Sequence, residues 1–160
     1  MLLYSPLWLF LVPGAVLAAL GVAGFTAILL GTPRPGGVAL GINTMLVAAM
    51  AMILGFQLVT FGLFARVFAA VEGLAPPDRR VTDLLERASL EKGVVAGLLV
   101  FLAGVAVLVA ATVVWQHTGF GELPPVESMR MSIPGMALTV LGMQIVFSSF
   151  LLSLVGLKRK

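Results

Sequence analysis

One arginine lies within a long apolar stretch of the sequence, where a charged side chain is costly. Arg66 follows an uncharged interval and precedes the predicted end of its helix by about a turn and a half. An ionisable group inside a spanning helix indicates a functional site, and a guanidinium at this depth suits a lipid phosphate. The alternative is that Arg66 only extends its charge to the head groups as an anchor. The same two interpretations apply to the basic residues predicted at the same surface: Lys158, Arg159 and Lys160.

Two glutamines occupy matched positions in apolar segments. Residues 54–59 (LGFQLV) resemble residues 141–146 (LGMQIV), so that Gln57 corresponds to Gln144. Such amides usually bond between neighbouring helices, and the alternative is a shared cleft that holds a lipid chain or head group. The match also suggests a duplicated helical hairpin, although compositional bias alone could produce it.

The residues that catalysis normally requires are sparse. Asp78 and Asp83 are the only aspartates and have no Asp-x-Asp spacing, so no site for a metal-bound nucleotide diphosphate is evident. His117 is the single histidine and has no neighbouring acid or cysteine, which is typical of an interfacial residue. No glycine-rich phosphate loop occurs. We therefore expect no catalytic residue, metal site or cofactor in this chain.

The composition predicts a membrane protein. The 160 residues are 60% hydrophobic and 11% charged, with a mean hydropathy of +1.12. A soluble domain carries roughly 25% charged residues. The basic residues flank the apolar segments instead of lining one polar face, which argues against nucleic-acid binding.

The predicted fold is an all-α membrane protein with four transmembrane helices in a single domain, residues 1–160. The uncharged intervals and their glycine and proline boundaries place the helices at about 7–30, 44–71, 93–115 and 132–157. Asn43 or Thr44 is expected to cap the second helix. A short amphipathic surface helix is expected at about 78–90, because Val81, Leu84, Leu85 and Ala88 form one apolar stripe.

The distribution of basic residues predicts the orientation. With four spans, eight of the ten Lys and Arg residues fall on one side of the membrane, and that side should be cytoplasmic. Both termini are then cytoplasmic. The two on the other side are Arg34 and Arg130.

Several strings in the chain resemble the C-terminal membrane region of bacterial family 2 glycosyltransferases of the polyprenyl-phosphate or dolichyl-phosphate sugar synthase type. They are Leu3–Phe10, Val12–Gly14, Leu54–Ala69, Leu90–Gly93 and Pro134–Leu157. The resemblance implies a bacterial inner-membrane anchor that helps to present polyprenyl phosphate. It also implies a separate cytoplasmic domain, in cis or in trans, that binds the nucleotide sugar. No such domain is recognisable in these residues, so we expect a fragment or a separately encoded membrane half.

Two other functions fit the same composition. A small four-helix transporter or lipid flippase would normally need an embedded acid, and none lies within the predicted spans. A membrane assembly subunit, or a homo-oligomer, would use the many glycines for close helix contact.

Overall fold

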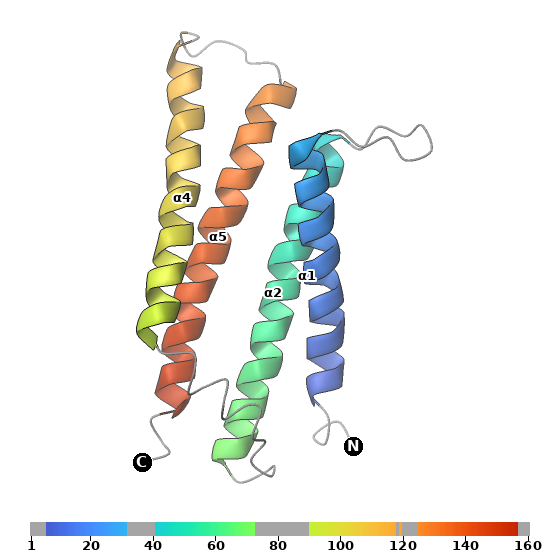
Figure 1. The fold of residues 1–160 in the computed structure, drawn as a ribbon, viewed down its shortest axis with the longest axis vertical. Coiled ribbons are helices and arrows are strands. Elements are labelled where there is room, and N and C mark those ends of the chain that lie inside the picture. The colour runs from blue at the N-terminus through green and yellow to red at the C-terminus, as the bar shows by residue number, and fades with distance from the viewer. Residues whose placement is uncertain (1–5, 32–40, 73–89, 118, 120–124, 157–160) are drawn as a thin grey trace, which may run out of the picture.

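The fold comprises four long helices that alternate in direction (Figure 1). The computed structural model describes residues 6–31, 41–72, 90–117, 119 and 125–156. Within these ranges the helices are α1 (Pro6–Leu30), α2 (Ile42–Val71), α4 (Leu90–His117) and α5 (Pro125–Gly156). Each is long and apolar enough to cross a membrane, which confirms the predicted all-α membrane fold. The predicted surface helix at 78–90 lies, apart from Leu90, outside the described residues.

The start of α2 differs from the sequence-based expectation. The helix begins at Ile42, its N-cap residue is Gly41, and no side chain caps it, so the predicted cap by Asn43 or Thr44 is wrong. Ile42 packs against the buried core of the bundle. Burial of this side chain favours the extension of the helix beyond the polar residues that would otherwise have ended it.

The second hairpin is also longer than predicted. Helix α4 begins at Leu90 instead of Gly93 and runs to His117, and α5 begins at Pro125 instead of Ser132. Proline is favoured at the first helical position because its missing N–H has no partner there in any case. Pro134 consequently lies inside α5 rather than in its first turn.

Glycines bring the helices of each hairpin into backbone contact. A Cβ atom added to Gly55 of α2 would lie 2.7 Å from the carbonyl oxygen of Gly14 in α1. In the second hairpin, a Cβ atom added to Gly142 of α5 would lie 2.8 Å from the carbonyl oxygen of Gly97 in α4. Both distances are too short for a side chain, so these glycines set the spacing of the helices.

The contacts of the two hairpins match residue by residue. Equivalent positions have residue numbers that are 83 higher in α4 than in α1, and 87 higher in α5 than in α2. A Cβ atom added to Gly55 would contact Ala18, and a Cβ atom added to Gly142 would contact the equivalent residue, Phe101. A Cβ atom added to Gly21 would contact Met52 and Ala48. A Cβ atom added to Gly104 would contact the equivalent residues, Thr139 and Gly135. The hairpins are therefore structural repeats, as the glutamine strings suggested.

A buried cluster joins the two hairpins toward the end of the bundle where α1 ends and α5 begins. Its members come from α1, α2 and α5: Phe25, Ile28, Met45, Ala48, Ala49, Ile133 and Ala137. The side chain of Arg130 adds a hydrogen bond of 3.3 Å, donated by Nη2 to the carbonyl oxygen of Ile28. This carbonyl is among the last four of α1, which have no partner within the helix.

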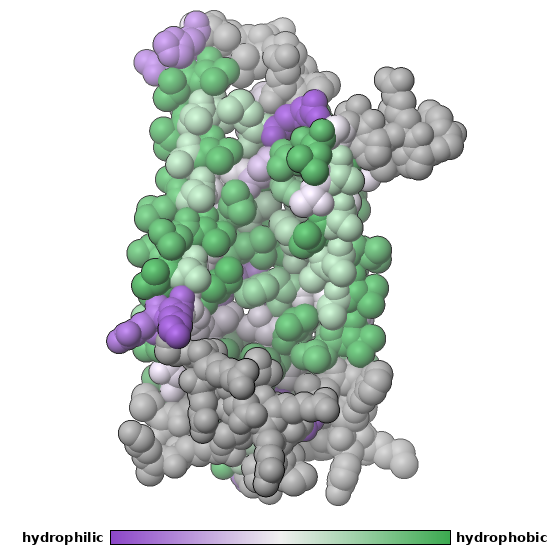
Figure 2. Space-filling model, viewed as in Figure 1, coloured by the Kyte–Doolittle hydropathy of each residue, from purple (hydrophilic) through white to green (hydrophobic). Residues whose placement is uncertain are grey.

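The outer surface of the bundle is suited to lipid. Figure 2 shows a broad hydrophobic band along the helices, with hydrophilic residues at both ends of α4 and near the beginning of α5. Large exposed apolar side chains along the helices include Leu20, Leu99 and Phe147. Large contiguous apolar surfaces of this kind mark contact with a membrane. The chain is an integral membrane protein.

Candidate lipid-facing sites

Arg66 lies near the end of α2 that adjoins the start of α4. It precedes the last helical residue, Val71, by five positions, which corresponds to roughly 7 Å along the axis. Its side chain is half-buried. The exposed charges of Glu72, Glu91 and Lys92 lie at the same end of the bundle (Figure 1). Arg66 therefore lies about a turn and a half inside the end of its own helix, whereas Glu72 directly follows that end.

The predicted partners of Arg66 lie outside the described residues. Helix α5 ends at Gly156, at the same end of the bundle as the end of α2 (Figure 1). The three basic residues follow in the sequence: Lys158, Arg159 and Lys160. Their role in binding a lipid phosphate stays a prediction.

The two matched glutamines have different surroundings. Gln57 is exposed, whereas Gln144 is half-buried. The Oε1 atom of Gln144 is fully buried and accepts no hydrogen bond from the residues that the structure describes. Gln144 follows Ala137 by seven positions and Ile133 by eleven, so all three lie on one face of α5, the face that packs on the first hairpin.

The hydroxyl groups mostly bond within their own helices. Thr60 donates to the carbonyl oxygen of Phe56 at 2.8 Å, and Ser149 donates to that of Ile145 at 2.8 Å. Thr139 likewise donates to the carbonyl oxygen of Gly135 at 2.7 Å. These bonds satisfy the hydroxyls without a partner helix. The close helix contacts consequently depend on small side chains.

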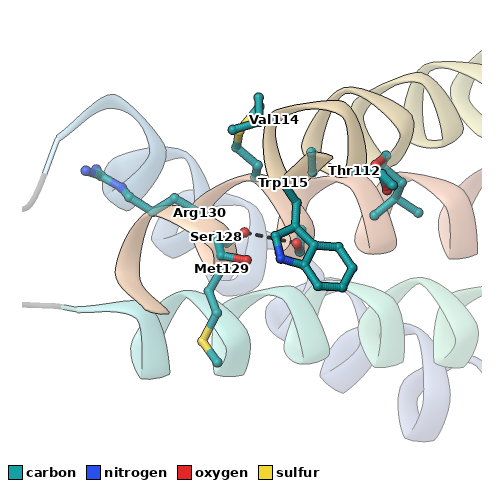
Figure 3. A pocket seen from close by; sticks show the side chains of 10 residues that line it. Thr112, Val114, Trp115, Ser128, Met129 and Arg130 are labelled. Carbon is teal, nitrogen blue, oxygen red and sulfur yellow. Dashed lines mark hydrogen bonds between the residues drawn. The ribbon is translucent and has the colours of Figure 1, made fainter. Parts of the chain in front are cut away.

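A pocket of about 720 Å³ lies between the end of α4 and the beginning of α5. Leu108, Ala111, Thr112 and Trp115 line it from α4, and residues 128–132 line it from α5. Figure 3 shows the Trp115 ring beside Ser128 and Met129, with the Arg130 side chain directed away from the ring. The sequence analysis missed this pocket, although the spacing of Leu108, Ala111 and Trp115 signals one helical face.

None of these sites has the composition of a catalytic centre. Among the described residues, no group of three or more histidine, aspartate or glutamate side chains could hold a metal ion. What the described sites offer is a half-buried cation at one end of the bundle and an apolar pocket with hydroxyl groups at the other.

Comparisons with known proteins agree with the membrane fold and define the family. The family model of the glycosyltransferase family 2 C-terminal transmembrane region matches residues 63–156. The low-salt glycan biosynthesis hexosyltransferase Agl6 of Haloferax volcanii is 34% identical over 157 residues. The match covers 98% of this chain and 37% of that relative's length. No solved structure matches the chain. The chain belongs to the glycosyltransferase family 2 C-terminal transmembrane regions.

Proposed function

We propose that the chain anchors a glycosyltransferase in the membrane and presents its lipid acceptor, polyprenyl phosphate, to a cytoplasmic domain that binds the nucleotide sugar. Family membership is the observation that carries this proposal. The relative named as a hexosyltransferase supports it, because nearly all of this chain aligns within that longer protein. The reaction itself would take place on residues outside this chain.

The proposed orientation places the end of α2 and the start of α4 in the cytoplasm. Most of the basic residues belong to the sequence segments predicted on that side of the membrane, and the positive-inside rule assigns such a side to the cytoplasm. Helix α1 begins at the same end of the bundle (Figure 1). A catalytic domain joined or docked at this end would meet nucleotide sugars, which are cytoplasmic and too polar to enter the bilayer.

Arg66 is the proposed contact for the acceptor phosphate. Its position five residues before the end of α2 brings the side chain within reach of the lipid head groups, where a guanidinium can donate two parallel hydrogen bonds to a phosphate. The chain-terminal Lys158, Arg159 and Lys160 would add a less specific attraction for anionic lipid. In this arrangement the prenyl chain stays in the bilayer beside α2.

Replacing Arg66 tests this assignment. In nanodiscs of neutral lipid, Arg66→Ala should weaken the binding of a short polyprenyl phosphate by roughly tenfold, the effect of losing about 1.4 kcal/mol of charge-assisted hydrogen bonding. Arg66→Lys should lose less, because it keeps the charge but not the paired donors. Binding would be measured by native mass spectrometry or by displacement of a fluorescent analogue.

The matched control is Arg130→Ala, which removes an arginine from the opposite end of the bundle. It should leave polyprenyl phosphate binding unchanged. Resistance to alkaline extraction would show that each variant is still inserted. Equal affinity of Arg66→Ala and the unsubstituted chain would exclude Arg66 from the acceptor site.

A further inference from the structure

The two structural repeats contact each other through different surfaces. The first hairpin contributes buried side chains of α1 and α2 that include Phe25, Ile28 and Met45. The second hairpin contributes the back of α5, through Ile133 and Ala137. A contact between unlike surfaces of two repeats is head-to-tail, so each repeat keeps one surface that the other repeat does not cover.

The uncovered surface of the first hairpin is the back of α2. The equivalents of Ile133 and Ala137, 87 residues earlier, are Leu46 and Met50. Their side chains are 48% and 57% exposed, whereas Ile133 and Ala137 are 6% and 2% exposed. Gln57, the equivalent of Gln144, is exposed on the same face. This face of α2 is therefore equivalent to the buried contact face of α5, but its side chains are exposed.

The uncovered surface of the second hairpin is the pocket beside Trp115. The equivalents of Phe25 and Ile28, 83 residues later, are Leu108 and Ala111, and the equivalent of Met45 is Ser132. All three of these equivalents line the 720 Å³ pocket. The positions that are buried in the contact with α5 on the first hairpin thus line a pocket on the second hairpin (Figure 3).

The side-chain sizes of the two uncovered surfaces complement each other. Three residues of the pocket are smaller than their equivalents in the buried cluster of the first hairpin: leucine replaces phenylalanine, alanine replaces isoleucine, and serine replaces methionine. On the back of α2 the change is in the other direction, because Met50 stands where α5 has Ala137. A wider groove and a larger inserting side chain conserve the total volume at the contact.

We propose that the pocket between α4 and α5 receives α2 of a second copy of this chain, through Leu46 and Met50. The contact repeats the one that joins the two hairpins within the chain. The proposal depends on the fold alone and not on the proposed function.

Disulfide cross-linking between two copies tests the contact directly, because the natural chain contains no cysteine. Two differently tagged full-length chains would be co-expressed, one with Met50→Cys and the other with Ala111→Cys, and oxidised in native membranes. The mixed pair should give a covalent dimer that carries both tags, and either variant expressed alone should not. As a positive control, Ile28→Cys and Ala137→Cys in one chain should form the equivalent internal disulfide.

Filling the pocket provides the second test. The reporting pair would be Leu46→Cys in one chain and Leu108→Cys in the other. An additional Ala111→Phe in the chain with Leu108→Cys should lower the cross-linked fraction roughly tenfold, as expected for a tenfold loss in affinity. Ala106→Phe, on the exposed side of α4, is the matched control and should leave the fraction unchanged.

Three results would overturn the proposal. Cross-linking of Met50→Cys to itself would show that the backs of two α2 helices meet. Absence of the mixed dimer, with the internal control disulfide formed, would mean that lipid occupies the pocket. Persistence of the reporting cross-link in the Ala111→Phe variant would place the contact elsewhere.

Discussion

At the scale of single residues, the polar side chains within the bundle differ in how well their hydrogen-bonding groups are satisfied. Threonine and serine hydroxyls bond to carbonyl groups one turn earlier in their own helices. Gln144 instead buries an oxygen that accepts no bond from the described residues. A buried acceptor of this kind costs roughly 1–3 kcal/mol.

Replacing Gln144 by a residue of similar volume should therefore stabilise the bundle. Gln144→Met is expected to raise the free energy of unfolding by about 1 kcal/mol, because it removes the unsatisfied acceptor and preserves packing. Gln57→Met, at the exposed equivalent position, should change it by less. Reversible unfolding in mixed micelles would measure both. A marked destabilisation by Gln144→Met would indicate that the amide makes an essential bond.

At the scale of the helices, backbone contact at glycines holds each hairpin together. Gly142→Ala would place a Cβ atom 2.6 Å from the Phe101 Cα atom and 2.8 Å from the Gly97 carbonyl oxygen. Since both are backbone atoms, α4 and α5 must separate, at an expected cost of about 1–3 kcal/mol. Unfolding of the variant in mixed micelles would measure this loss.

Gly31→Ala provides the control for this substitution. Its added Cβ atom would have no neighbour within 4 Å, so its stability should equal that of the unsubstituted chain. Equal stability of Gly142→Ala would mean that the helices of the second hairpin are not held at backbone contact.

The existence of the four helices could be predicted from sequence, but several of their ends could not. Uncharged apolar intervals are a strong signal, because only a helix satisfies the backbone of such a segment in lipid. Local capping rules failed at Asn43 and Thr44 because Ile42, one residue earlier, gains burial in the core. Helix α5 begins before Ser132 because Pro125 suits the first helical position, and Arg130 in the added turns bonds to the carbonyl oxygen of Ile28.

The arrangement of the candidate site residues was harder to predict. Arg66 was identified because a charge within an apolar span is conspicuous in any sequence. The pairing of Gln57 with Gln144 in one cleft was suggested by their similar neighbours, yet one is exposed and the other half-buried. Their difference arises because the two hairpins meet through unlike surfaces, which a repeat in the sequence does not reveal. The pocket beside Trp115 depends on the same asymmetry.

At the scale of the whole molecule, the membrane fold must serve a reaction that, under the proposed function, starts in the cytoplasm. A membrane region of the glycosyltransferase family 2 type with an even number of spans returns the chain to the side from which it started. The proposed function requires that this side be cytoplasmic, because Arg66 and a domain that binds nucleotide sugar must meet there. The opposite orientation would place Arg66 in the wrong leaflet.

Cysteine accessibility at the helix ends tests this requirement most directly. Single cysteines would replace the exposed residues Glu72 and Lys92 at one end of the bundle and Gly41 and His117 at the other. With a membrane-impermeant maleimide, Glu72→Cys and Lys92→Cys should be labelled only in inverted vesicles, and Gly41→Cys and His117→Cys only in right-side-out vesicles. The reverse pattern, or labelling of both ends of α4 from one side, would contradict the account.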